Sequence, residues 1–131
     1  MELLEQLVNL NGVSGNEHEV RNFIIKEAKK HIRKVEVDKM GNIVAVKKGK
    51  RPAILFLAHM DEIGLMVKGI NKSGKISIST IGTVDPHILL GQRVDIETKN
   101  KEKVGGVITN NDVLNDFIVE KKVKIGDLYV Y

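Results

Sequence analysis

The segment from Pro52 to Val67 constrains the fold most, because an uncharged apolar run leads directly into a histidine and an aspartate. Residues 53–58 carry no charge and include four large apolar side chains. A short run that is apolar on both faces is typical of a strand buried in the middle of a sheet. Ligands of α/β proteins collect at the carboxyl ends of such strands, and His59-Met60-Asp61 occupies that place. The segment therefore predicts a central strand that presents a reactive group.

The composition is that of a globular protein in water. The chain has 131 residues, of which 42% are apolar and 29% charged, enough for one ordinary domain or two very small ones. No stretch approaches the ~20 apolar residues of a membrane span. The first five residues are acidic and amphipathic, unlike a secretory signal. These features predict a cytoplasmic protein without a membrane partner.

The absence of cysteine limits the chemistry. It excludes disulfides, thiolate metal sites and a cysteine nucleophile, so any metal ligands must be histidines and carboxylates. The net charge is +4, but acidic residues are interleaved with most lysines and no aromatic residues support base stacking. A solvated lysine-rich surface is therefore the better interpretation, and we expect no nucleic-acid partner. There is also no G-x-S-x-G motif, and Gly105-Gly106 lacks the lysine motif of a phosphate loop.

The first half of the chain predicts helices followed by strands. Apolar spacing predicts a short helix over 2–10 and a longer one over 17–32. The longer helix follows Ser14-Gly15-Asn16-Glu17, which has the S-x-x-E form of a capping box. Two strands, 34–38 and 43–46, flank a turn at Lys39-Met40-Gly41-Asn42. With the central strand, these elements make an α/β unit.

The pattern changes after Asp61. Several short strands separated by turn residues predict a small β-barrel or sandwich, with the boundary near Val67. The expected strands are 63–70, 75–81, 93–98, 103–109 and 124–131. We therefore expect an α/β fold with two parts, residues 1–66 and 67–131.

The first part lacks the means to cover its own central strand. Two helices and two flanking strands cannot shield both faces, and four exposed large apolar side chains would cost ~1.5–3 kcal/mol each. We therefore expect the β part, another copy of the chain, or sequence absent from it to provide the cover.

Several short motifs occur together in a fixed order. They are Gly12-Val13-Ser14-Gly15 before Glu17, Asp38-Lys39-Met40-Gly41-Asn42, Ala58-His59-Met60-Asp61-Glu62-Ile63-Gly64, Val84-Asp85-Pro86 before Gly91-Gln92-Arg93-Val94, and Ile125-Gly126-Asp127. In this set the chain resembles, from end to end, the N-terminal portion of the dinuclear metallo-aminopeptidases that assemble into tetrahedral dodecamers. These enzymes are also described as endoglucanase-M-like or glutamyl-aminopeptidase-like.

The resemblance implies a fold, an activity and a site. Residues 1–66 would begin a catalytic α/β lobe, and residues 67–131 would be a shortened PDZ-like β-barrel that serves in subunit assembly. His59 would bind one of two metals, zinc or cobalt, and Asp61 would orient its imidazole. The reaction would be metal-assisted removal of N-terminal residues from peptides. The remaining ligands and the general base of the family lie beyond the matched region, so we expect the chain to be a truncated relative that is inactive alone.

Other interpretations remain open. His59 could be an ordinary surface or packed histidine, or could form a metal site with Asp61, Glu62, and Asp85 or His87, although no spacing requires this. His87 is better interpreted as an exposed loop histidine beside a turn, and His18 and His31 as solvated helix residues.

A different class of function is a non-catalytic assembly or regulatory subunit. Such a subunit would self-associate or join a full-length aminopeptidase, and the same uncovered strand motivates it.

Overall fold

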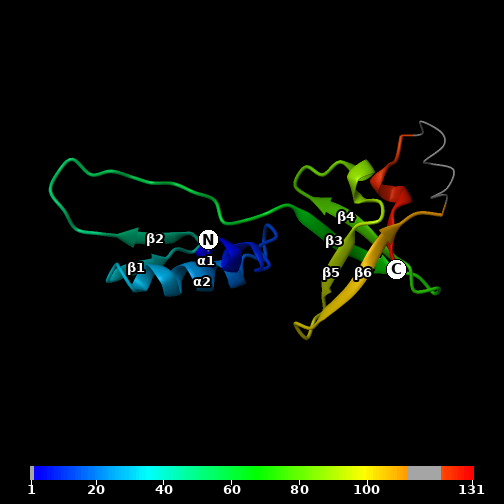
Figure 1. The fold of residues 1–131 in the computed structure, drawn as a ribbon, viewed down its shortest axis with the longest axis horizontal. Helices are drawn as coiled ribbons and strands as arrows, with labels where there is room; N and C mark the ends of the chain where they lie inside the picture. The colour runs from blue at the N-terminus through cyan, green and yellow to red at the C-terminus, as the bar shows by residue number, and fades with distance from the viewer. Residues whose placement is uncertain (1, 112–121) are drawn as a thin grey trace. The chain divides into compact units, whose positions relative to one another are not determined.

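The computed structural model describes residues 2–111 and 122–131, which form two compact units (Figure 1). Unit 1 is Met1–Glu62 and unit 2 is Ile63–Tyr131, so the division lies four residues before the boundary expected from sequence. No helix in the described ranges has the length and apolar character needed to cross a membrane.

Unit 1 combines two helices with one hairpin. Its elements are α1 Glu2–Val8, α2 His18–Lys29, β1 Lys34–Val37 and β2 Ile43–Val46. The strands pair antiparallel over their full length, and α2 contacts both. Val20 of α2 is buried, as its place on the predicted apolar stripe requires. The helices and the hairpin therefore follow the sequence pattern, with ends that differ by a few residues.

The start of α2 differs from the prediction. Its N-cap is Glu17, which makes no side-chain capping bond, so the predicted capping box is wrong. The Glu17 carboxylate accepts a bond from the Gly15 amide instead. Ser14 is also engaged elsewhere, because its hydroxyl donates to Asp61. The Ser14 side chain, which the capping-box motif assigned to the helix, is therefore used in a long-range contact with Asp61.

The turn between β1 and β2 is held by Asp38. Its carboxylate accepts bonds from the Met40 amide at 2.8 Å and from the Asn42 amide at 2.9 Å. The Asn42 side-chain amide donates a third bond at 2.8 Å. Gly41 supplies the positive φ of 89° that the turn needs. These bonds, the Asn42 side chain first, hold the pKa of Asp38 below its usual value.

The predicted central strand is not formed, so that prediction is wrong for this chain. Residues 53–61 have no strand partner and run as a loop between β2 and β3 (Figure 1). The four large apolar side chains at 54–57 are between 77% and 88% exposed. A strand needs hydrogen-bonding neighbours, and β1 and β2 pair only with each other. The sequence encodes an apolar segment, but the described residues supply no sheet for it to enter.

Unit 2 is a five-stranded sheet in the order β3-β4-β7-β6-β5. Its strands are β3 Gly64–Ile70, β4 Ile76–Ile81, β5 Arg93–Glu97, β6 Lys103–Thr109 and β7 Tyr129–Val130. All described pairings in it are antiparallel. The C-terminal strand inserts between β4 and β6, so residues far apart in the sequence become neighbours. The protein is thus a mixed α/β chain with few helices.

Two short helical turns interrupt the predicted β pattern. Pro86–Leu89 forms η1, and Ile125–Asp127 forms η2, so the predicted strand 124–131 is reduced to β7. The turn residues expected between the strands 103–109 and 124–131 lie mostly outside the described residues, which omit 112–121. Gly106 lies within β6, where an added side chain would overlap Val130, so close packing rather than phosphate binding accounts for this glycine.

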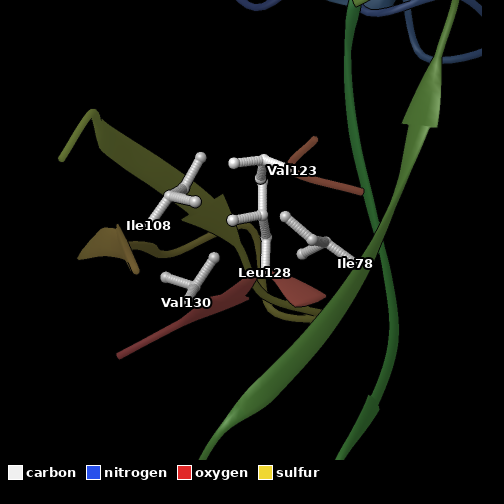
Figure 2. Packing of buried hydrophobic residues seen from close by; sticks show 5 residues of the cluster. All are labelled: Ile78, Ile108, Val123, Leu128 and Val130. Carbon is white, nitrogen blue, oxygen red and sulfur yellow. The ribbon is translucent and has the colours of Figure 1, made fainter. Parts of the chain in front are cut away.

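The buried core of unit 2 lies between its strands and the C-terminal segment (Figure 2). Ile78 of β4, Ile108 of β6 and Val130 of β7 pack with Val123 and Leu128. Ile108 is fully buried, with 0% exposure. The core is entirely aliphatic, as a chain without tryptophan and with three phenylalanines predicts.

We expect Ile108→Ala to lower the free energy of unfolding of unit 2 by about 2 to 4 kcal/mol, because it leaves a cavity in a fully buried site. Urea unfolding followed by circular dichroism measures the change. The matched control is Ile88→Ala, at a side chain that is 61% exposed, which should cost less than about 0.5 kcal/mol. Equal losses in the two variants would contradict this core.

We expect Asn42→Ala to raise the pKa of Asp38, because it removes the largest contribution to the lowered value. The folded pKa is depressed, so the stabilisation of the turn is present above the ordinary pKa of ~3.9 and is lost as pH falls through the folded pKa. A carboxyl ¹³C NMR titration measures it. Asn71→Ala, at a turn of unit 2, is the control and should leave the Asp38 titration unchanged.

Candidate functional site

A pair of backbone hydrogen bonds joins two distant loops of unit 1. The Glu62 amide donates to the Gly12 carbonyl at 2.7 Å, and the Ser14 amide donates to the Glu62 carbonyl at 3.3 Å. Val13 and Glu62 thereby form an isolated parallel bridge. The bridge fixes the residues that follow the apolar segment against the loop that precedes α2.

Gly12 allows this close approach. A Cβ at this position would lie 2.9 Å from Cγ2 of Val20 and 3.2 Å from the Met60 carbonyl oxygen, which is too close for an ordinary contact. The Glu62 side chain also accepts a bond from the Gly12 amide at 3.2 Å. Glu62 therefore holds the loop before α2 through both its backbone and its side chain.

The bridge brings Ser14, Asp61 and His59 together. The Ser14 hydroxyl donates to Oδ2 of Asp61 at 2.5 Å. The other carboxylate oxygen, Oδ1, is 3.2 Å from Nδ1 of His59, and that nitrogen is also 3.0 Å from the Asp61 carbonyl oxygen. Both neighbours of Nδ1 are acceptors, so Nδ1 carries the proton in the neutral ring and Nε2 carries the lone pair.

The electrostatics of the cluster favour an ionised Asp61. The Ser14 hydrogen bond is the main influence that lowers the pKa of Asp61, and the charge of His59 contributes less. The Asp61 side chain is 43% exposed and that of His59 is 85% exposed. The imidazole is thus exposed to solvent while it contacts a negatively charged carboxylate.

His87 is exposed, as the sequence predicted, with its side chain 49% accessible, but it is not a loop residue. It lies in η1, its Nδ1 is 2.9 Å from Oδ1 of Asp85, and its Nε2 accepts a bond from the Val123 amide at 3.2 Å. The Asp85 carboxylate also caps η1 by accepting from the His87 amide at 3.0 Å. These bonds to His87 hold the pKa of Asp85 below its usual value. Both ring nitrogens are occupied, so His87 serves the structure of unit 2.

The predicted ligand positions do not gather into a complete metal site. Within residues 2–111 and 122–131, no group of three or more histidine, aspartate or glutamate side chains could hold a metal ion. His31 is exposed near the end of α2, and His18 is partly buried at its start. A catalytic zinc takes three protein ligands, so the residues present do not by themselves fit one.

A cavity lies in unit 2, and its lining contains none of the predicted site residues. It has a volume of about 550 Å³, and its wall includes Asn71, Lys75, Asn110 and Tyr129. The Lys75 ammonium donates to Asn111 at 2.6 Å and lies 4.2 Å from the centre of the Tyr129 ring. Its charge is therefore used to connect the turn after β3 with the end of β6 and with β7.

Comparison with known proteins identifies the family. Residues 41–130 match the family described as M42 glutamyl aminopeptidase, so the chain belongs to this family of aminopeptidases. The lysyl aminopeptidase from Pyrococcus furiosus is 38% identical to this chain over 107 residues, which cover 81% of this chain and 31% of that protein.

Solved structures of relatives have the same fold. The aminopeptidase APDkam598 of Desulfurococcus kamchatkensis matches with a TM-score of 0.90 and 32% identity over 98% of this chain and 36% of that one. The TET1 peptidase of Pyrococcus horikoshii matches with a TM-score of 0.83 and 32% identity over 99% and 39%. That peptidase can assemble into a tetrahedron or a large octahedral shell. The chain therefore spans about a third of the lengths of these relatives.

The sequence predicted His59 and Asp61 as site residues, and the structure places them in contact, but the sequence assigned Ser14 to the wrong partner. The signal was present, because Gly12-Val13-Ser14-Gly15 belongs to the same ordered set of motifs as the H-x-D segment. The capping-box pattern assigned Ser14 to the start of α2. The bridge at Val13 instead brings Ser14 beside Asp61, which is 47 positions later in the sequence. Contacts at that separation have no periodicity from which to predict them.

We expect Gly12→Ala to weaken the bridge, because the new methyl group must displace Val20 or the Met60 carbonyl. An overpacking cost of about 1 to 3 kcal/mol would make the Glu62 amide exchange about 5- to 150-fold faster. Hydrogen exchange followed by NMR measures it. Gly49→Ala is the control, since a Cβ there would meet nothing within 4 Å. Unchanged Glu62 exchange in Gly12→Ala would contradict the geometry of the bridge.

Proposed function

We propose that this chain supplies the N-terminal part of a metal-dependent aminopeptidase that removes N-terminal residues from peptides. Membership of the M42 glutamyl aminopeptidase family supports the reaction class. In this proposal His59 is one ligand of a zinc or cobalt ion, and Asp61 is the carboxylate that orients it. Because the chain spans about a third of its relatives, the activity requires polypeptide beyond the 131 residues.

The observation that carries the proposal is the pairing of His59 with Asp61. A histidine that ligates a metal commonly donates its other ring N–H to a carboxylate, which fixes the tautomer and raises the basicity of the ligating nitrogen. The distance of 3.2 Å between Nδ1 and Oδ1 of Asp61 supports this role and leaves Nε2 as the donor atom. A bound metal would activate a water and polarise the scissile carbonyl.

The described residues supply one such ligand, so we assign no catalytic step to this chain alone. His59 binds and orients, while the groups that activate water would come from elsewhere. Unit 2, in this proposal, is the PDZ-like barrel that serves in subunit assembly, and the assembly of the Pyrococcus horikoshii relative into closed shells supports it. We retain the cytoplasm as the proposed location.

A second candidate is a non-catalytic assembly or regulatory subunit, and the uncovered apolar segment favours it. Leu55, Phe56 and Leu57 are 79%, 88% and 86% exposed. Burying the four large side chains of this segment would contribute on the order of 6 to 12 kcal/mol, comparable with the whole stability of a typical domain. In this proposal the segment joins a full-length or complementing aminopeptidase chain, or a second copy of this chain.

We expect the 131-residue chain alone to show no release of amino acids from peptides, with or without added zinc or cobalt, because it holds one of the ligands that a metal needs. We expect metal-dependent release when the chain is produced together with the remaining two thirds of the Pyrococcus furiosus lysyl aminopeptidase. A discontinuous assay with aminoacyl p-nitroanilides measures it. Turnover by the chain alone would overturn the proposal.

Substitutions separate the two candidates. Phe56→Asp should prevent co-purification of the two polypeptides, whereas Met40→Asp, at a side chain that is also almost fully exposed (86%), should not. His59→Ala should abolish turnover while the complex still forms. A complex without turnover in the unsubstituted protein would favour the non-catalytic subunit. Failure of any complex to form would count against both candidates.

A further inference from the structure

We propose that Ser14 is a positioning residue that holds the Asp61 carboxylate so that the His59 imidazole keeps one tautomer and one direction. The inference deepens the proposed function, on which the use of His59 as a ligand rests. The assignment itself concerns only three side chains of this chain and is measurable without metal or substrate.

The geometry divides the two oxygens of Asp61 between two partners. Oδ2 accepts the Ser14 hydroxyl at 2.5 Å, and Oδ1 lies 3.2 Å from Nδ1 of His59. A carboxylate rotates about χ2 with a broad, two-fold preference, so one bound oxygen also sets the plane in which the other lies. Ser14 therefore determines where Oδ1 meets the imidazole.

Exposure makes such an anchor necessary. The His59 side chain is 85% exposed and that of Asp61 is 43% exposed, so water competes for every donor and acceptor of the pair. Exposed charged pairs contribute little by themselves and seldom hold one geometry. A hydroxyl donating to a carboxylate is charge-assisted and stronger than a neutral bond, so it can restrain Asp61 where the imidazole alone would not.

The backbone fixes Ser14 in turn. Its amide donates to the Glu62 carbonyl at 3.3 Å. In the same bridge, the Glu62 amide donates to the Gly12 carbonyl at 2.7 Å. Ser14 and Asp61 are thus each next to a residue of the bridge, and their side chains meet beside it. The anchor for the imidazole begins 47 residues away from Asp61 in the sequence.

The order of contacts excludes a catalytic triad. In a serine nucleophile site the hydroxyl contacts the histidine, and the aspartate contacts the far side of the ring. Here the Ser14 hydroxyl donates to Asp61, and its proton is directed at the carboxylate rather than at His59. Ser14 consequently acts through Asp61 and has no role as a nucleophile in this arrangement.

The test is the tautomer of His59 in the 131-residue chain, read from long-range ¹H–¹⁵N correlation spectra at about pH 8.5, well above the reference histidine pKa of ~6.5. We expect the unsubstituted chain to show mainly the Nδ1–H tautomer. Ser14→Ala should lower the ratio of Nδ1–H to Nε2–H about fivefold, the effect of losing one charge-assisted bond at a partly exposed site. Ser14→Thr, which keeps a hydroxyl, should have the same ratio of Nδ1–H to Nε2–H as the unsubstituted chain.

Two controls isolate the effect. Ser73→Ala removes an exposed serine of unit 2, and its spectrum should match that of the unsubstituted chain. The His87 signal serves as an internal reference, because its partners Asp85 and Val123 do not include Ser14. Slow exchange of the Glu62 amide in Ser14→Ala would show that the backbone bridge persists and that only the side-chain contact was lost.

The outcomes are distinguishable. If Asp61→Asn changes the His59 tautomer and Ser14→Ala does not, the role of Ser14 is overturned and the proposed function stands. If neither substitution changes it, Asp61 does not orient the imidazole, and that part of the proposed function fails as well. If Ser14→Thr lowers the ratio of Nδ1–H to Nε2–H as much as Ser14→Ala does, any substitution at this position disturbs the structure. That result would also overturn the proposal.

Discussion

The site depends on one small interaction, the parallel bridge between Val13 and Glu62. Two backbone hydrogen bonds hold the loop before α2 against the residues that follow the apolar segment. Gly12 makes the approach possible, because a side chain there would overlap Val20. With the bridge in place, Ser14 meets Asp61 and Asp61 meets His59, although the apolar segment that precedes them is unpaired. A few backbone contacts thus give order to a region that has little packing of its own.

The two units differ in how many hydrophobic side chains they bury. Of the buried hydrophobic residues in the described part of the chain, Val20 lies in unit 1 and the others form the core of unit 2. Unit 1 instead exposes large apolar side chains, with Phe56 and Leu57 more than four-fifths exposed. Apolar surface of this kind on a soluble fold usually marks an interface. The chain spans about a third of the lengths of its relatives, and in the proposed function polypeptide outside the 131 residues covers this segment.

Much of the local structure could be predicted from the sequence. The stripe containing Val20 predicted α2, alternation predicted β1, a short apolar run predicted β2, and Lys39-Met40-Gly41-Asn42 predicted the turn between them. The strands of unit 2 before residue 110 also followed their patterns, because each is a short apolar run between turn residues. The H-x-D motif identified His59 and Asp61, which the structure brings within 3.2 Å of each other. In these cases the deciding forces act within a few residues, so the sequence records them directly.

The remaining features required the tertiary structure. Residues 53–58 have the composition of a buried strand, but a strand exists only where neighbours accept its hydrogen bonds, and the described chain provides none. Ser14 has the spacing of a helix cap, yet its hydroxyl donates to Asp61, because the bridge brings the Asp61 carboxylate beside it. The sequence by itself determined which segments are apolar, which turn, and which residues carry chemistry. Only the tertiary structure decided which of them meet, because that depends on contacts between distant residues that no local pattern encodes.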